Sequence, residues 1–537
     1  MNSLVSSTCA RRLFMALAAI SGIFLTASCG NSSGLIPPNN NGFSASSLSG
    51  TYVISISGTD VNQTTESFFA IVGTITADGN GNLTGGTVDI NDANLGGSGV
   101  FPGLSLTPSK YSITPDGRGT GTLVTSQGTF GLDFSLTSSS HGLISRFDQG
   151  GTGSGTLDIQ SSATQSSLGS LAFSLSGAAG ANSLATVGAF TLNSSGTITS
   201  GQQDFNESGS SISGPTGSAL TGSLVLGASG TTGVAQLNSA FGSLVYDVWV
   251  IDSTHQKLIE TDASGIALSG DSFTQQTSFT AGQLVFTVQG EDNAQDVVAA
   301  GGYATTDVNG NISGGSEDYN NEGNATASIA FQGSCTTFTA GRCQLALTGF
   351  TNGSTGNLAF AAYPSSGGVL LLEDDSNGLL EGVAYAQGAT SFTAPGGYSL
   401  NLSGANSDGE GDVGEVDDIA QFNASTATSN NMTGVLDENS ILGGPVSTGL
   451  SGATYTPDSP ATGRGSITVP NLGTFIGTLN LEYYVVDAST VVFIDVDGEQ
   501  VAVGTFEAQP ASGSVAATRA HMTMRPVFRP HAAFRKK

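Results

Sequence analysis

A short acidic stretch, DGNGN at residues 78–82, places oxygen-bearing side chains at alternate positions, as calcium loops do at their start. Asp89 then falls at the twelfth position of such a loop. The position that needs glycine is held by Leu83, however, and the twelfth ligand is ordinarily a bidentate glutamate. Because the glycines suit the positive φ angles of a tight turn, we interpret the stretch as a hairpin, with calcium as the weaker alternative.

Internal copies of this region refine the interpretation. The pattern G-x-x-D-x-N occurs four times at steps of about 115 residues, and the segments ISRFD, LIETD, LLEDD and FIDVD recur with the same period. Two independent anchors with one period predict four tandem repeats. The DGNGN turn has an acidic copy in repeat 3 (DVNGN), but its counterparts in repeats 2 and 4, NSSGT and NASTATSNN, contain no acid. A calcium site common to all four repeats is therefore not expected.

The acid and amide of G-x-x-D-x-N persist in every repeat, which makes them the weak metal candidates of this chain. We expect them to form Asx-type turns at strand ends. If they gathered at a barrel mouth with Asp148, Asp262, Asp375 and Asp497, their oxygens would suit a hard cation such as calcium. No other cofactor is expected. The eight motif residues are Asp89, Asn91, Asp204, Asn206, Asp318, Asn320, Asp437 and Asn439.

Basic side chains are scarce, so those that recur are informative. Arg118, Arg342 and Arg464 follow glycine at matching positions, where repeat 2 has Thr232, and we expect each arginine to form a structural ion pair with a recurring aspartate. His141 and His255 also match, but four scattered histidines offer no zinc spacing. The motifs G-x-S-x-G and H-E-x-x-H do not occur. A non-enzymatic protein is the leading expectation, and a hydrolase using paired carboxylates on a polysaccharide is the alternative.

Each repeat is predicted to consist of short antiparallel strands. In TFGLDFSLT (129–137) the apolar residues alternate with small or polar ones, which is the pattern of a half-buried strand. About eight such segments in one repeat predict an all-β fold of four tandem β-barrels or β-sandwiches, with a propeller as a weaker alternative. Streptavidin- and lipocalin-like barrels are similar in architecture, although their family motifs are not found. The expected boundaries are 48–160, 167–276, 279–388 and 391–510.

The N-terminus has the features of an export signal. Arg11 and Arg12 precede an apolar stretch (13–25), and small residues lead to Cys29, so residues 1–28 are expected to be removed. The ending LTASCG resembles a bacterial lipobox, which implies that Cys29 is lipidated, although Thr26 stands where leucine is usual. Ordinary signal cleavage near Ala27 is the alternative. Residues 29–47 resemble a flexible tether.

Cysteine use and charge agree with export. Cys335 and Cys343 flank a short turn and are expected to form a disulfide outside the cytoplasm. Residues 29–518 contain six basic and 42 acidic residues, which disfavours binding to nucleic acid. The basic tail, 511–537, is expected to be disordered.

Taken whole, the chain resembles bacterial Gly/Ser/Thr-rich repeat lipoproteins, a likeness that brings no known activity with it. Gly30 after the cysteine implies, by that resemblance, an outer-membrane destination. The expected function is binding, adhesion or surface structure in the cell envelope, through a lipid anchor and a glycan or protein ligand. A calcium-stabilised surface protein is a further alternative.

Overall fold

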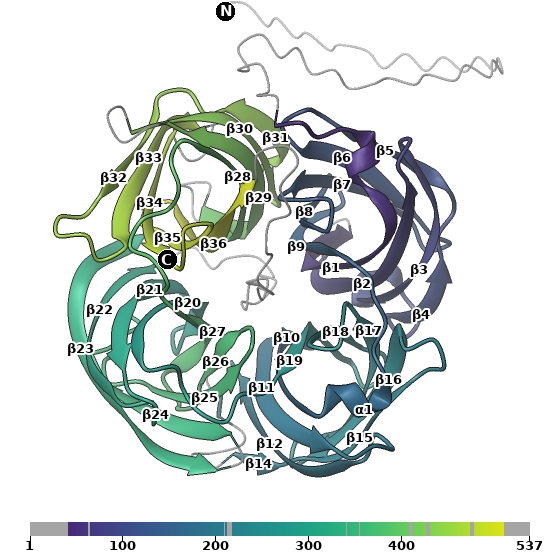
Figure 1. Ribbon diagram of the computed structural model, residues 1–537, viewed down its shortest axis with the longest axis horizontal. Coiled ribbons are helices and arrows are strands. Elements are labelled where there is room, and N and C mark those ends of the chain that lie inside the picture. Colours follow the sequence, from purple (N-terminus) through teal and green to yellow (C-terminus); the bar gives the residue numbers. More distant parts are fainter. Residues whose placement is uncertain are drawn as a thin grey trace, which may run out of the picture. The chain divides into compact units, whose positions relative to one another are not determined.

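The computed structural model describes residues 41–509 except 63–64, 209, 212–216, 340, 354, 408–411, 426–429 and 473–476. About 70% of the described residues lie in strands, which pair antiparallel and form four β-barrels, numbered here 1 to 4 along the sequence (Figure 1). The prediction of tandem β-barrel repeats is confirmed. The signal peptide, Cys29, the tether as far as residue 40 and the basic tail lie outside the described residues. No helix among the described residues has both the length and the apolar character needed to cross a membrane.

Barrel 1 is an up-and-down meander, because strands adjacent in the sequence pair in space and β2 also pairs with β3 to close the sheet. Two 3₁₀ turns accompany it, η1 (Ala45–Ser47) and η2 (Ala93–Leu95). Its strands are β1 (Ser49–Asn62), β2 (Thr65–Asp78), β3 (Asn82–Asp92), β4 (Val100–Ser105), β5 (Ser109–Ile113), β6 (Arg118–Val124), β7 (Thr129–Leu136), β8 (His141–Asp148) and β9 (Gly151–Ile159).

Barrel 2 follows the short helix α1 (Gln165–Leu168) and repeats the same order of strands. Here the pairing of β14 with β12 and an isolated bridge between Thr197 and Ser223 join the two ends of the sheet. Its strands are β10 (Ser170–Ala179), β11 (Asn182–Leu192), β12 (Ile198–Glu207), β13 (Ser210–Ser211), β14 (Ser218–Ala219), β15 (Thr221–Leu226), β16 (Thr232–Ser239), β17 (Gly242–Val250), β18 (His255–Glu260) and β19 (Ile266–Thr274).

Barrels 3 and 4 close completely, through the pairing of β20 with β27 and of β29 with β30. Barrel 3 comprises β20 (Gly282–Asp292), β21 (Val297–Thr306), β22 (Ile312–Asn321), β23 (Asn324–Thr339), β24 (Arg342–Thr348), β25 (Ala359–Ser365), β26 (Gly368–Glu373) and β27 (Gly378–Ala386). Barrel 4 comprises β28 (Gly396–Ser407), β29 (Val413–Ala424), β30 (Asn431–Ser440), β31 (Gly444–Gly449), β32 (Ala453–Pro457), β33 (Arg464–Leu472), β34 (Gly477–Val485), β35 (Thr490–Asp495) and β36 (Gln500–Gln509).

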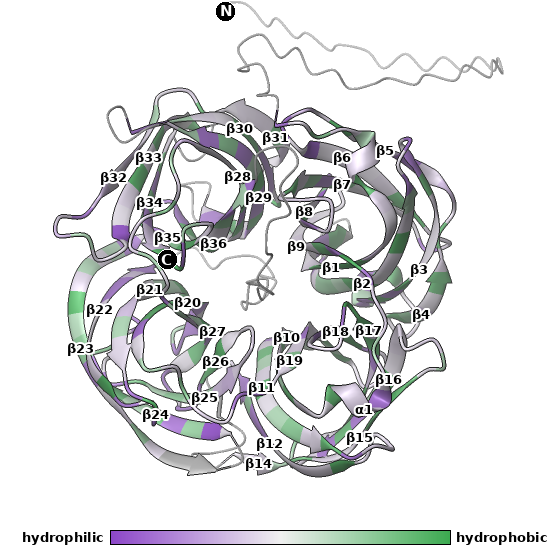
Figure 2. Cartoon of the chain, in the orientation of Figure 1, coloured by the Kyte–Doolittle hydropathy of each residue, from purple (hydrophilic) through white to green (hydrophobic). Residues whose placement is uncertain are grey.

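Alternation along the strands sets the core of each barrel. One face of each strand lines a lumen packed with apolar side chains, and Figure 2 shows apolar and polar residues interspersed along the strands. A buried apolar residue just before the first strand joins each lumen, namely Leu48, Leu168, Phe279 and Phe392. Strand β4 was not expected from the sequence, because Pro102 and Gly103 argue against a strand there.

Apolar residues on the outer faces pack between barrels. Trp249 on β17 lies in a cluster with Phe68 and Val72 of barrel 1, and Tyr484 on β34 lies in a cluster with residues of barrel 3 such as Val285. Strands that are apolar on both faces therefore pack against a neighbouring repeat. The described barrels therefore pack against one another and are not independent domains.

Candidate functional site

The recurring G-x-x-D-x-N motif lies on strands β3, β12, β22 and β30, at corresponding places in the four barrels. The expectation of Asx-type turns at strand ends was wrong for the asparagines, because each of them reaches into another barrel. Asn206 Nδ2 donates to the backbone oxygens of Glu373 and Gly378 of barrel 3, both at 2.8 Å. The same residue type therefore serves as a connector between barrels rather than as a local cap.

The other three asparagines make equivalent contacts. Asn91 Nδ2 donates to the backbone oxygens of Glu260 and Ile266 in barrel 2, each at 3.1 Å. Asn320 Nδ2 donates to three backbone oxygens of barrel 4, those of Asp495, Asp497 and Gln500, and Asn439 Nδ2 donates to three of barrel 1, those of Arg146, Asp148 and Gly151. The contacts thus run from barrel 1 to 2, 2 to 3, 3 to 4 and 4 back to 1.

The motif aspartates face the same junctions. Asp204 accepts hydrogen bonds from Arg342 Nε at 2.7 Å and from the Tyr363 hydroxyl at 2.6 Å, both in barrel 3. Asp318 accepts equivalent bonds from Arg464 and Tyr484 of barrel 4. The expected pairing of a recurring arginine with a recurring aspartate is therefore present, and it connects different repeats.

The junctions of barrel 1 use variants of this pairing. Where barrel 4 pairs Arg464 with Tyr484 across neighbouring strands, barrel 2 pairs Thr232 with Trp249, and Trp249 Nε1 donates to Asp89 at 2.6 Å. With only neutral donors beside it, Asp89 is affected chiefly by burial, which raises its pKa to about 6. At the junction of barrels 4 and 1, Arg118 Nη1 lies 3.6 Å from Asp437. The sequence did not reveal the aromatic partners, because their separation from the arginine position varies, from 17 residues in repeat 2 (232 to 249) to 21 in repeat 3 (342 to 363).

The four aspartates that end the recurring segments ISRFD, LIETD, LLEDD and FIDVD have another shared role. Each accepts a hydrogen bond from the backbone N–H of a neighbouring strand in its own barrel, as Asp262 does from Val245 at 2.9 Å and Asp375 from Ala359 at 2.7 Å. Asp148 and Asp497 do the same with Gly131 and Asn480. Within the described ranges, no group of three or more His, Cys, Asp or Glu side chains has the arrangement of a metal site. The calcium hypothesis therefore rests on sequence spacing alone.

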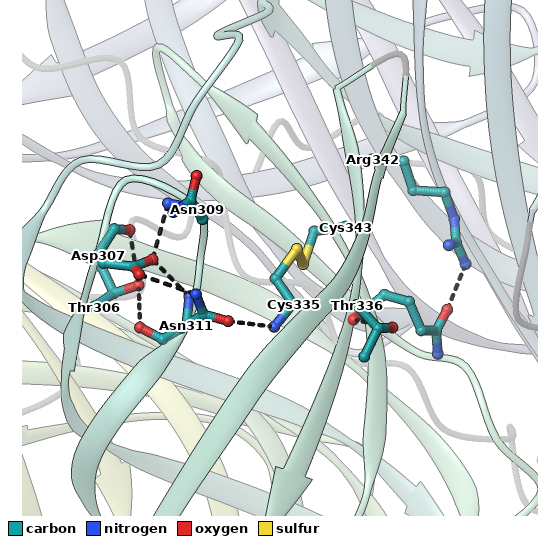
Figure 3. Close-up of a disulfide and its surroundings, with 9 residues drawn as sticks. Thr306, Asp307, Asn309, Asn311, Cys335, Thr336, Arg342 and Cys343 are labelled. Carbon is teal, nitrogen blue, oxygen red and sulfur yellow. Dashed lines mark hydrogen bonds between the residues drawn. A yellow bond between two sulfur atoms is a disulfide. The ribbon is translucent and has the colours of Figure 1, made fainter.

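The acidic turns that first suggested calcium are closed by hydrogen bonds of their own. Asp307 accepts bonds from the backbone N–H groups of Asn309 and Asn311 and from the side chain of Asn311, as Figure 3 shows. Asp78 makes the same set with Asn80 and Asn82. These hydrogen bonds lower the pKa of Asp78 and of Asp307. Both are Asx-type hairpin turns.

Beside the turn of barrel 3, Cys335 and Cys343 form a disulfide between β23 and β24, with their Cα atoms 5.6 Å apart (Figure 3). Both strands belong to barrel 3, so the covalent link lies within that barrel and does not join it to another.

Buried charges connect barrels 4, 1 and 2. His141 Nδ1 lies 2.6 Å from Asp158, and its Nε2 lies 3.1 Å from Glu507 of barrel 4. Burial alone would lower the pKa of His141, but the Glu507 and Asp158 carboxylates outweigh it and raise that pKa to about 10. His255 and Lys257 of barrel 2 both contact Asp271, at 2.7 and 2.6 Å. This histidine site is an ion-pair network in a protein interior.

Two cavities are candidate ligand-binding sites. At the mouth of barrel 3, a cavity of about 400 Å³ is bounded by the linker 276–280 and the turn 364–368. A second, of about 200 Å³, lies between barrels 3 and 4 and has Glu322 and Glu499 in its wall. Sequence patterns alone did not point to either place.

Comparison with known proteins gives little further guidance. No family model matches the chain, and no curated protein matches it. Among solved structures, a variant of transferrin binding protein B from Haemophilus parasuis aligns at 7% identity over 71% of this chain and 86% of that chain, with a TM-score of 0.18. The isotype 1 protein from serogroup B Neisseria meningitidis aligns at 10% identity over 69% and 84%, with a TM-score of 0.19. Such low TM-scores carry no argument about function.

The asparagine contacts predict a large effect from a small substitution. Asn206→Ala removes two hydrogen bonds to backbone oxygens of barrel 3, so we expect the free energy of unfolding to fall by about 1–3 kcal/mol. Urea denaturation followed by circular dichroism measures this change. Asn309→Ala, in an exposed turn, is the matched control and should change stability by no more than about 0.5 kcal/mol. Equal effects of the two variants would contradict the connecting role of Asn206.

The buried ion pair predicts a non-additive pair of substitutions. Arg342→Met leaves the Asp204 carboxylate buried without its cation, so we expect a loss of about 3–5 kcal/mol, and adding Asp204→Asn should restore part of it. Arg118→Met removes the longer, more exposed pair with Asp437 and should cost about 1 kcal/mol or less. Additive effects of the Asp204 and Arg342 substitutions in a double-mutant cycle would rule out the coupling.

Buried carboxyl groups predict how stability depends on pH. Burial raises the pKa of Glu260 and of Glu317 to about 9, and that of Asp133 to about 8. Between the unfolded pKa near 4 and these values the folded state binds more protons, so stability falls as pH rises. The raised pKa of His141 acts in the same direction, because its stabilisation is complete below about 6.5 and disappears as pH rises towards 10.

We therefore expect the melting temperature to be higher at pH 5 than at pH 9, measured by circular dichroism at constant ionic strength. Glu260→Gln keeps a neutral side chain of similar size and should flatten this dependence. Burial alone would raise the pKa of Asp158, but the neighbouring His141 lowers it to about 2. The stabilisation that Asp158 contributes is therefore lost only at strongly acidic pH. A melting temperature that rises from pH 5 to pH 9 would contradict the assignment.

Proposed function

We propose that this chain is a non-enzymatic protein of the bacterial cell envelope, held by a lipid at Cys29, in which four joined barrels form one binding module. The observation that carries the proposal is the cavity at the mouth of barrel 3. Among the residues that the structure describes, its wall consists of neutral side chains such as Gln276, Ser278 and Tyr385 and contains no acid, histidine, cysteine or lysine. A cavity of about 400 Å³ with a neutral wall suits binding better than acid–base chemistry.

The head-to-tail contacts support the same proposal. Each barrel uses its motif residues to hold the next one, so the persistent polar residues of this chain have structural roles. Joined barrels keep their mouths and loops at fixed relative positions, which reduces the ordering cost when a glycan or protein at the cell surface binds. An outer-membrane location follows from the lipobox resemblance and the Gly30 position, and is part of the proposal.

A polysaccharide hydrolase is the second candidate, because Glu322 and Glu499 both lie in the wall of the cavity between barrels 3 and 4. Two carboxyl groups facing one space are the minimum for glycoside hydrolysis. Release of reducing ends from a polysaccharide, lost in Glu322→Gln and Glu499→Gln, would favour this candidate over binding. Retention of the polysaccharide without turnover favours the binding module.

Cys29→Ala tests the anchor. Because a thioether-linked lipid needs the cysteine sulfur, the variant should move from the membrane fraction to the soluble fraction of cells, as measured by ultracentrifugation and immunoblotting. Cys9→Ala lies inside the expected signal peptide and is the matched control, which should leave the protein in the membrane fraction. Continued sedimentation of Cys29→Ala with membranes would reject lipid anchoring at this residue.

A further inference from the structure

The lumen of barrel 3 contains a cavity of about 40 Å³ with an apolar wall that includes Phe286, Phe331 and Phe350. This volume corresponds to roughly three water-sized spheres, and apolar cavities of this kind remain dry and accept small apolar groups. The cavity at the mouth of the same barrel shares four wall residues with it, namely Phe279, Leu284, Val369 and Ala384. The two cavities therefore lie on either side of one constriction.

Phe279 lies at this constriction, because it borders both cavities and is almost completely buried. It packs on Gly310, whose φ is +86° and where an added Cβ would lie 2.6 Å from the phenylalanine ring. Gly310 thus gives the ring room at the bottom of the mouth. Movement of one side chain would join the two spaces.

At this level of the lumen, small residues distinguish barrel 3 from barrels 1 and 4, whereas barrel 2 has a pair of similar size that includes a hydrogen-bonded serine. Leu284 stands six positions before the glycine in the middle of the first strand, Gly290, and Ala384 pairs with the residue two positions after Leu284. In barrel 4 the matching residues are aromatic, and their rings lie 5.6 and 5.4 Å from that of Phe392. In barrel 2 the matching serine is covered by a hydrogen-bonded glutamine. The matching pairs are Tyr52 and Leu157, Leu171 and Ser272, and Tyr398 and Phe506.

The mouth has a different chemistry from the lumen. Its wall includes the hydroxyl groups of Ser278, Thr280, Ser365 and Ser366 and the amide of Gln276, without a charged side chain. Hydroxyls and amides bind the hydroxyl groups of a neutral ligand and offer no counter-charge to an anion. The ligand that fits both spaces is therefore apolar at one end and neutral and hydroxylated at the other.

We propose that barrel 3 binds a neutral, hydroxylated amphiphile, with the end of its alkyl chain in the lumen beyond Phe279 and its hydroxylated head in the mouth. This inference rests on the proposed binding function and names the class of ligand for one barrel. Barrels 1 and 4 carry larger residues at the positions of Leu284 or Ala384, barrel 2 carries a hydrogen-bonded serine at that of Ala384, and these three barrels act as the scaffold.

Octyl glucoside below its critical micelle concentration is the probe, titrated by calorimetry into the mature chain carrying Cys29→Ala. We expect saturable binding at one site. Methyl glucoside, which has the head without the chain, should not bind, and octanoate, which has a charged head, should bind at least tenfold more weakly. Equal binding of octanoate would overturn the neutral-head assignment, and equal binding of methyl glucoside would overturn the lumen assignment.

Ala384→Leu introduces the residue of barrel 1 and should weaken octyl glucoside binding at least tenfold while the circular dichroism spectrum stays unchanged. Val308→Leu enlarges an exposed side chain of barrel 3 by one methylene group and should leave binding unchanged. If Ala384→Leu does not fold, Leu284→Tyr, which introduces the residue of barrels 1 and 4, replaces it. Unchanged octyl glucoside binding in whichever of these two variants folds overturns the proposal. Retained membrane anchoring and glycan binding would still leave the broader envelope function standing.

Discussion

The arrangement of this protein depends on one repeated interaction, the donation of hydrogen bonds from an asparagine amide on one barrel to backbone oxygens of the next. Amide groups such as that of Asn206 donate buried hydrogen bonds to carbonyl oxygens of the next barrel, which makes their removal costly. The adjacent aspartate adds a second contact to the same neighbour. Because each barrel has both the donor patch and the acceptor patch, the contact is head-to-tail, and four copies return to the first.

The four junctions share this interaction but differ in what surrounds it. Apolar clusters support the contacts of barrel 1 with 2, 2 with 3, and 3 with 4. Polar pairs are prominent where barrel 4 meets barrel 1, as in the bonds of Ser135 with Ser399 and of Thr152 with Asp417. Burial raises the pKa of Asp417 at this junction. A contact built on polar groups depends more on protonation than one built on apolar area, so this junction contributes to the pH dependence of the whole assembly.

Divergence among the repeats is concentrated away from the shared contacts. The lumen of barrel 4 is filled by rings such as Phe392, Tyr398 and Phe506, which pack edge to face. Barrel 3 keeps the same backbone but has Leu284 and Ala384 at the matching places, and its lumen retains an empty apolar space. Because the junction residues recur while the lumen residues differ, one copy has an apolar cavity in its lumen without a change in how the copies are joined.

The sequence by itself determined the number of repeats, the all-β class and the strand pattern, because periodic motifs and alternating residues are local signals. It also indicated that the recurring arginines would pair with recurring aspartates. It did not indicate that Asn91 or Asn206 contacts another barrel, since asparagine is a common turn residue and its partners are not known until the register of the strands is known. The partners of the motif and the cavity of barrel 3 were decided by the tertiary structure, because they bring together residues more than 100 positions apart.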